Sequence, residues 1–174
     1  YMGERLTERE VFGQPGWGHQ VRYRFASSFA SFGDTVLDAA CGIGYGRTFF
    51  DSSVQYIGVD KEDHEAGFVD EFIQADLNTW EPDFDFNLAV SFETIEHVQD
   101  YKFLISQLKK STRWIITSVP VVPTVHMNEW HLHDFTPLEL PGYIEDDNWE
   151  MMQYLAQPQE LSEIYVFHRK GTEF

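Results

Sequence analysis

A short apolar segment that runs directly into a glycine-rich loop most restricts how this chain can fold. Residues 35–40, TVLDAA, have the length and composition of a buried strand, and the loop CGIGYG follows at once. Glycine is needed where the backbone must turn sharply or approach a ligand without an intervening side chain. A dinucleotide fingerprint counted from Gly42 needs its third glycine at position 47, where this chain has Arg47. The observed spacing, G-x-G-x-G, therefore disfavours a nicotinamide-binding enzyme.

Strand and helix patterns alternate along the rest of the chain. Strands are expected at residues 35–40, 55–60, 68–76, 86–92 and 113–120, and helices at 19–31, 47–53 and 97–110. A capping box predicts one more short helix, which starts at Thr136 and is ended by Pro141. Residues 148–156 and 160–168 flank a polar turn, which predicts an antiparallel hairpin. The alternation predicts an α/β fold whose mostly parallel sheet is covered by helices on both faces.

Acidic residues close two of the predicted strands. Asp60 ends the strand at 55–60, and Asp76 ends the strand at 68–76. Ligands of open α/β sheets bind at the carboxyl ends of the strands, where a carboxylate can accept both hydroxyls of a ribose. Asp60 is placed to do this, while Asp76 and Leu77 are placed to meet an adenine edge. Each acid taken alone also fits a solvated loop carboxylate, but the glycine loop and two acids at successive strand ends form a coherent nucleoside site.

These segments resemble the class I S-adenosylmethionine-dependent methyltransferases over about residues 3–143. The opening GERLTE…HQVRYRFA followed by VLDAACGIGYG is similar to that family, and so are SFETIEHVQDYKFL and SVP…HMNEWHLHDFTPLEL. The similarity is greatest to its small enzymes that act on sugars and other small metabolites. The resemblance implies a Rossmann-like three-layer sandwich, a seven-stranded sheet with an antiparallel last strand, and S-adenosyl-L-methionine as the cofactor.

The family's cofactor contacts map onto the predicted strand ends. The residues assigned to the cofactor are Asp38, Ala39, Gly42, Gly44, Asp60, Asp76, Leu77 and Phe92. In one respect the chain departs from the family. Only 15 residues separate Asp60 from Asp76, so the helix between these two strands must be very short or missing. This departure affects the wall of the adenine pocket and the role of Asp76.

Histidines occupy the positions expected to meet the methyl acceptor. His97 follows the fourth predicted strand and is the first candidate for a general base, because an imidazole titrates near neutral pH. His131 and His133 are the second candidates. A histidine that only forms local hydrogen bonds at a helix start is the alternative for His97. The side chains expected to cover the cofactor are those of Trp17, His19 and Tyr23, and those expected to form the substrate wall are Asn128, Trp130 and His131. For each aromatic side chain, simple core packing is the alternative.

The same segment also carries residue types that could bind a metal. A His-x-His pair on extended chain points both rings the same way, so His131 and His133 with Asp134 or Glu129 have the right ligand types. Histidines in a polar loop more often hydrogen-bond or line a pocket. We therefore expect no bound metal. Cys41, the single cysteine, lies in the glycine loop without a neighbouring base and is expected only to pack.

Composition limits the partners and the compartment. Twelve Lys and Arg against 29 Asp and Glu give a net charge of -17, which would repel a nucleic acid at long range. No apolar run is long enough to span a membrane, and one cysteine suits a reducing cytoplasm. We expect a single cytoplasmic domain over 1–174, with a cover segment at 1–17 and a core at 18–174, present as a monomer or homodimer. A small hydroxyl- or amine-bearing molecule is the expected acceptor. The alternatives are a non-catalytic S-adenosylmethionine-binding module and a nucleotide- or NAD-binding enzyme.

Overall fold

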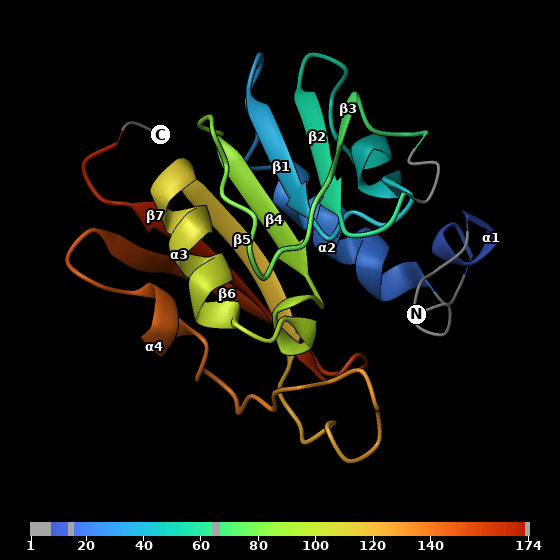
Figure 1. The fold of residues 1–174 in the computed structure, drawn as a ribbon, viewed down its shortest axis with the longest axis vertical. Helices are drawn as coiled ribbons and strands as arrows, with labels where there is room; N and C mark the ends of the chain where they lie inside the picture. The colour runs from blue at the N-terminus through green and yellow to red at the C-terminus, as the bar shows by residue number, and fades with distance from the viewer. Residues whose placement is uncertain (1–7, 14–15, 64–66, 173–174) are drawn as a thin grey trace.

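A seven-stranded mixed sheet forms the centre of the computed structural model, which describes residues 8–13, 16–63 and 67–172 (Figure 1). The strands are β1 (Thr35–Ala39), β2 (Gln55–Asp60), β3 (Glu71–Gln74), β4 (Leu88–Phe92), β5 (Trp114–Pro120), β6 (Trp149–Gln157) and β7 (Ser162–Arg169). Their order is β3-β2-β1-β4-β5-β7-β6, and β7 runs antiparallel to both of its neighbours. The α/β fold and the C-terminal hairpin are confirmed, and the sheet is mixed because β7 is inserted between β5 and β6.

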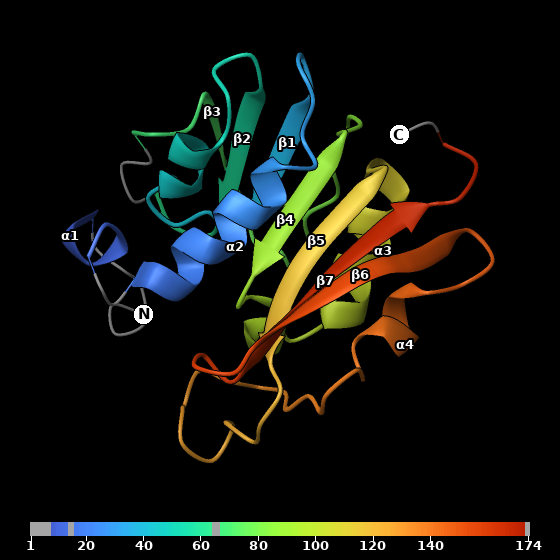
Figure 2. The same cartoon turned by 180° about the vertical axis from the view of Figure 1, so that it is seen from behind.

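Helical segments cover both faces of the sheet (Figures 1 and 2). On one face lie α2 (Trp17–Ser27) and the short 3₁₀ helix η2 (Tyr45–Phe49); on the other lie α3 (Tyr101–Ser111) and α4 (Pro141–Ile144). Side chains alternate across the sheet, so each strand contributes to two apolar cores. On β1, Val36 packs into the core that contains α2, whereas its neighbour Leu37 packs into the core that contains α3. In the described ranges, no helix has the length and apolar character needed to cross a membrane.

The helix expected at 97–110 begins later than predicted. Residues Ile95–His97 form a separate 3₁₀ turn, η3, and α3 starts only after Asp100. The Asp100 carboxylate accepts a hydrogen bond from the backbone amide of Phe103 at 2.9 Å, which is the geometry of a helix N-cap. His97 therefore lies in a turn before the helix, where its ring can face the carboxyl end of β4.

The prediction of a regular helix at 47–53 is wrong. After the glycine loop the chain forms only the 3₁₀ turn η2, and Phe50 is already extended. Between β2 and β3, none of the described residues 61–63 and 67–70 is helical, as the short spacing predicted.

The prediction of a helix that starts at Thr136 is also wrong. Glu139 does reach back to accept a hydrogen bond from the Thr136 backbone amide at 2.9 Å, as a capping box requires. Leu138, however, has a left-handed backbone with φ of 60°, which a helix cannot contain. The helix α4 therefore begins at Pro141, the residue predicted to end it. An N-terminal element, α1 (Glu8–Val11), lies within the proposed cover segment, of which 1–7 and 14–15 fall outside the described residues.

Candidate active site

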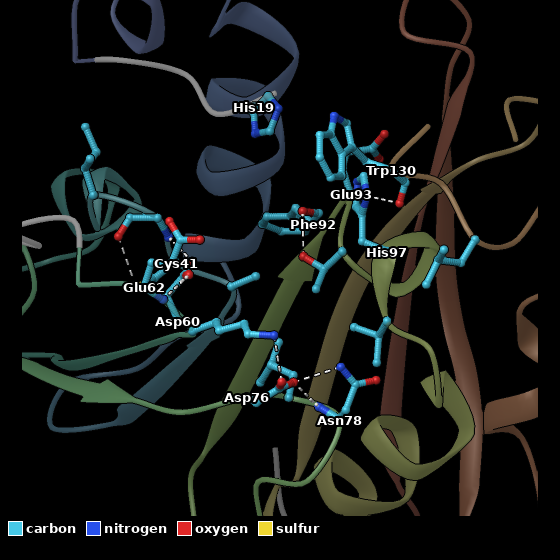
Figure 3. Close-up of a pocket in the computed structure, with 18 of the residues that line it drawn as sticks. His19, Cys41, Asp60, Glu62, Asp76, Asn78, Phe92, Glu93, His97 and Trp130 are labelled. Atoms are coloured by element: carbon cyan, nitrogen blue, oxygen red, sulfur yellow. Dashed lines mark hydrogen bonds and ion pairs between the residues drawn. The ribbon is translucent and has the colours of Figure 1, made fainter. Parts of the chain in front are cut away.

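A cavity of about 820 Å³ opens at the carboxyl ends of β1, β2 and β4 (Figure 3). The glycine loop, the end of β2 and the segment after β3 form one side. The turn after β4 and the segment 129–132 form the other, and α2 contributes His19 and Tyr23. Of the residues assigned to the cofactor from sequence, those that line this cavity are Gly42, Asp60, Asp76, Leu77 and Phe92. The cavity therefore lies at the strand ends where the cofactor site is predicted.

The glycine loop meets the cavity through Gly42. Its φ is 57°, a left-handed conformation that side-chain-bearing residues rarely adopt, and a Cβ placed there would have nothing within 4 Å. Bare backbone with open space in front of it suits the close approach of a ligand. Gly44 has a different role, because a Cβ there would lie 2.5 Å from Val69 Cγ1, so this glycine permits packing and does not reach the cavity.

Asp60 is fixed at the end of β2 by backbone hydrogen bonds. Its Oδ2 accepts from the Gly42 amide at 2.9 Å, and its Oδ1 accepts from the Glu62 amide at 3.2 Å. The residue is only 3% exposed, yet its carboxylate forms part of the cavity wall. A carboxylate accepts hydrogen bonds and cannot donate them when ionised, so a sugar with vicinal hydroxyls is a suitable partner.

The segment after β3 forms part of the cavity wall. Asp76 accepts from the backbone amide and the side-chain amide of Asn78, at 3.0 and 2.8 Å, and pairs with Lys61 at 3.0 Å. The Asn78 hydrogen bonds, followed by Lys61, lower the pKa of Asp76 to about 2, so this carboxylate is ionised near neutral pH. Leu77 beside it is buried and presents an apolar side chain to the cavity. The combination of an apolar surface and an acceptor suits a purine edge.

Asp38 lies behind the loop and not on the cavity wall. It is fully buried, and its Oδ2 accepts hydrogen bonds from the hydroxyls of Tyr56 at 2.7 Å and Tyr23 at 3.1 Å. Burial raises the pKa of Asp38 to about 7, and the two tyrosine hydroxyls partly oppose that rise. Asp38 and the adjacent Ala39, both assigned to the cofactor from sequence, are not among the residues that line the cavity.

His97 lies on the side of the cavity opposite the glycine loop, with Trp130 beside it (Figure 3). Its Nδ1 lies 3.0 Å from the Trp130 carbonyl oxygen. A carbonyl can only accept, so Nδ1 carries the hydrogen, and the neutral ring has its lone pair on Nε2. Trp130 is itself fixed, because its backbone amide donates to the Asn128 side chain at 3.0 Å. Trp130 lines the cavity as expected, whereas Asn128 contacts Trp130 and does not line the cavity. Trp17 also lies outside the cavity lining and is 62% exposed.

The two other histidines proposed as bases do not line the cavity. His133 places Nε2 3.0 Å from the Val98 carbonyl and packs its ring on Tyr101. His131 turns toward His97, with ring centroids 4.6 Å apart. The expectation that both rings point the same way is wrong, because residues 131–136 form irregular chain and not a strand. Asp134, which was predicted with them as a possible metal ligand, instead accepts hydrogen bonds from the backbone amides of Thr124 and Val125.

Glu93 and His19 also line the cavity. Glu93 follows β4 with φ of 48°, and its carboxylate accepts from the hydroxyls of Ser118 and Ser162 at 2.7 and 3.0 Å. Its Oε1 is also 3.4 Å from the guanidinium of Arg22. Sequence reasoning missed Glu93, although an acid directly after a strand was the signal used for Asp60. Burial, and then the charge of Arg22, lowers the pKa of His19 to about 3, so this ring is neutral near pH 7.

Comparisons with known proteins agree with this geometry. A family model described as a methyltransferase domain matches residues 17–165. A search of curated protein sequences finds no match.

Several solved structures share the fold at low sequence identity. Magnesium protoporphyrin IX methyltransferase (ChlM) from Synechocystis PCC 6803, solved with S-adenosylmethionine, has a TM-score of 0.72 and 16% identity, over 97% of this chain and 87% of that chain. The N-methyltransferase NodS from Bradyrhizobium japonicum WM9, solved with S-adenosylhomocysteine, has a TM-score of 0.69 and 12% identity, over 94% and 96%. An rRNA methylase from Escherichia coli has a TM-score of 0.62 and 16% identity, over 87% and 63%.

The family match spans the strands, the glycine loop and the cavity described above. Gly42, Asp60, Asp76 and Leu77, which were assigned to the cofactor from sequence, all line this one cavity. The chain therefore belongs to the class I S-adenosylmethionine-dependent methyltransferases, with S-adenosylmethionine as its cofactor.

Proposed function

We propose that this domain transfers a methyl group to the hydroxyl or amine of a small molecule bound between His97 and residues 129–132. S-adenosylmethionine supplies the methyl group in an already activated form. The observation that supports the proposal is the arrangement of one cavity, which has the cofactor-binding loop and acids on one side and His97 with Trp130 on the other. The protein's task is then to hold the acceptor in line with the methyl group, which contributes up to roughly 7–11 kcal/mol in favourable cases.

His97 is the side chain proposed to act on the acceptor's proton. The Trp130 carbonyl holds its Nδ1–H, so Nε2 carries the lone pair in the neutral ring. A hydroxyl acceptor must lose its proton during transfer, and a positioned histidine typically adds about 10²–10⁴-fold to the rate. An amine that arrives neutral needs less assistance. A hydroxyl acceptor should therefore depend on His97 more strongly than an amine does.

Charge favours a neutral or cationic acceptor over a polyanion. The cavity wall carries the acidic side chains of Glu62, Glu93 and Glu129, and the whole chain has a net charge of -17. These charges would repel a phosphate-rich substrate. Sugar derivatives and small amines meet the requirement. The similar structures include enzymes named for a porphyrin and for rRNA, so the fold alone does not select the acceptor.

The test is a methyl-transfer screen that detects S-adenosylhomocysteine release. Neutral sugars, amino sugars and small amines would be compared with a short RNA. We expect turnover with a member of the first group and none with RNA. His97→Ala should then lower kcat by about 10²–10⁴-fold for a hydroxyl acceptor. His133→Ala is the matched control, because its ring lies outside the cavity. Turnover on RNA alone, or wild-type turnover by His97→Ala, would refute the corresponding part of the proposal.

A further inference from the structure

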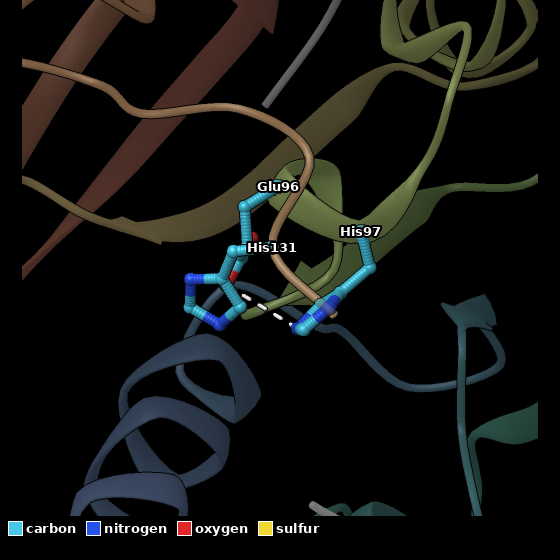
Figure 4. Close-up of side chains that lie close together, drawn as sticks. All are labelled: Glu96, His97 and His131. Carbon is cyan, nitrogen blue, oxygen red and sulfur yellow. Dashed lines mark ion pairs between the residues drawn. The ribbon is translucent and has the colours of Figure 1, made fainter. Parts of the chain in front are cut away.

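Glu96, His97 and His131 converge at the edge of the cavity, although 35 positions separate the first from the last (Figure 4). One ligand atom from each, a carboxylate oxygen or a ring nitrogen, lies within 4.8 Å of the others. We propose that these three side chains bind a divalent first-row transition-metal ion. The site is separate from the residues that face the cofactor, but His97 belongs to both the cluster and the cavity wall.

Backbone hydrogen bonds hold the two contributing segments together. The Leu132 amide donates to the Glu96 carbonyl at 2.8 Å, next to the contact between His97 and the Trp130 carbonyl. The Glu96 side chain is 1% exposed, and its Oε1 lies 3.8 Å from His97 Nε2. A buried carboxylate is costly unless positive charge or hydrogen bonds compensate it. A cation held between the carboxylate and the two rings would lie next to this buried negative charge.

The outer contact of His97 sets the tautomer that a metal requires, and the outer contact of His131 is compatible with it. His97 Nδ1 must donate to the Trp130 carbonyl, so its Nε2 has the lone pair. His131 Nδ1 lies 2.6 Å from Thr124 Oγ1, which in turn lies 3.4 Å from Asp134 Oδ1. The Thr124 hydroxyl can therefore donate to Asp134 and accept from His131 Nδ1–H. Metal-binding histidines characteristically donate their second ring N–H to a carbonyl or another acceptor in this way.

The donor set indicates the kind of ion. Two imidazoles and one carboxylate suit zinc, manganese, iron or cobalt, whereas calcium and magnesium prefer oxygen ligands. Three protein ligands leave coordination positions for other molecules. Because His97 lines the cavity, such a position is accessible from the acceptor end. If the proposed function holds, an oxygen of the acceptor could bind there, and the ion would make its proton easier to remove. His97 would then act as a ligand and not as the base.

The spacing of the His-x-His pair predicts that His131 acts together with His133, not with Glu96 and His97. The structure turns His133 away to the Val98 carbonyl and brings His131 to Glu96 and His97. The sequence signal for this group is the adjacent pair Glu96 and His97.

The test measures metal binding directly, on protein without a histidine tag that has been treated with chelator and dialysed. Titration with Co²⁺, followed by visible absorption, and competition with Zn²⁺ should show one ion per chain. Glu96→Gln and His131→Ala should each weaken binding by more than about 100-fold, the upper end of what loss of an outer contact costs. His133→Ala and His126→Ala are the controls and should bind like the wild type. S-adenosylhomocysteine affinity should be unchanged in all four variants, which shows that they remain folded.

The inference fails if the wild-type chain binds no stoichiometric ion. It also fails if Glu96→Gln and His131→Ala bind as tightly as the wild type. Failure of the proposed function would look different, because the ion would still bind while the acceptor screen gave no turnover. Turnover that is equal with and without the ion would leave the metal site in place and refute its contact with the acceptor.

Discussion

The backbone amide of Gly42 donates a 2.9 Å hydrogen bond to Oδ2 of Asp60, and this bond joins the glycine loop to the carboxyl end of β2. Both residues line the cavity. The contact fixes the bare backbone of the loop and the carboxylate relative to each other before any ligand arrives. A site organised in advance loses less conformational entropy on binding.

The buried carboxylate of Asp38 should make stability depend on pH. Its pKa is about 7 in the folded protein against 3.8 as the ordinary value, because burial disfavours the charged form. A raised carboxylate pKa contributes stability at low pH that is lost as the pH rises from about 4 to about 7. The loss is on the order of 4 kcal/mol by linkage. Asp38→Asn should lack it, so the difference in unfolding free energy between wild type and variant should change across this range. The unfolding free energies of wild type and Asp38→Asn can be measured by chemical denaturation at pH 4 and pH 7.5. An equal difference between the two proteins at both pH values would contradict the raised pKa of Asp38.

Gly46 should not tolerate a methyl group. A Cβ at this position would overlap the Tyr56 hydroxyl and the Tyr23 ring, and both tyrosines are held by hydrogen bonds to Asp38. Gly46→Ala should therefore destabilise the protein by about 1–3 kcal/mol, the usual cost of overpacking. Gly142→Ala is the matched control, since its Cβ would meet nothing within 4 Å. Chemical denaturation measures both, and equal midpoints would show that the loop adjusts freely.

Arg22 should stabilise the fold more than an exposed cation does. Its side chain is 1% exposed, its Nε donates to Gln157 Oε1 at 2.8 Å, and its guanidinium lies 3.4 Å from Glu93. Removing one partner of a buried pair costs about 3–5 kcal/mol, and the partial exposure of Glu93 reduces that to about 2–4. Lys110, whose partner Glu81 is exposed, provides the comparison. Arg22→Met should lower the melting temperature clearly and Lys110→Met hardly at all; similar small shifts would argue against a structural role for the buried pair.

The strands were predictable because their signals are local. The apolar runs ending at Asp60 and Phe92 and the hairpin around residue 158 need no knowledge of distant partners, and each appears close to its predicted bounds. Helix boundaries were less predictable. A strong cap at Asp100 shifts α3, and the left-handed backbone at Leu138 prevents the helix that the capping box favoured.

The cavity was easier to predict from sequence than the roles of individual residues. Topology alone brings strand ends together, so Asp60 and Asp76 could be placed at one edge. The orientation of side chains depends on contacts far along the chain. Tyr23 and Tyr56 hold Asp38 away from the cavity, and Thr124 holds His131 near Glu96. No local sequence pattern predicts either arrangement.

The affinity of S-adenosylhomocysteine for the wild type and for Asp60→Ala, measured by titration calorimetry, tests the placement of the cofactor most directly. Loss of hydrogen bonds to the carboxylate should weaken binding by about 1.5–3 kcal/mol, roughly 10- to 150-fold. Asp147→Ala, an exposed acid in the turn before β6, should bind like the wild type. The account predicts tight wild-type binding that depends on Asp60. Equal affinity in wild type and Asp60→Ala, or no binding by either, would contradict it.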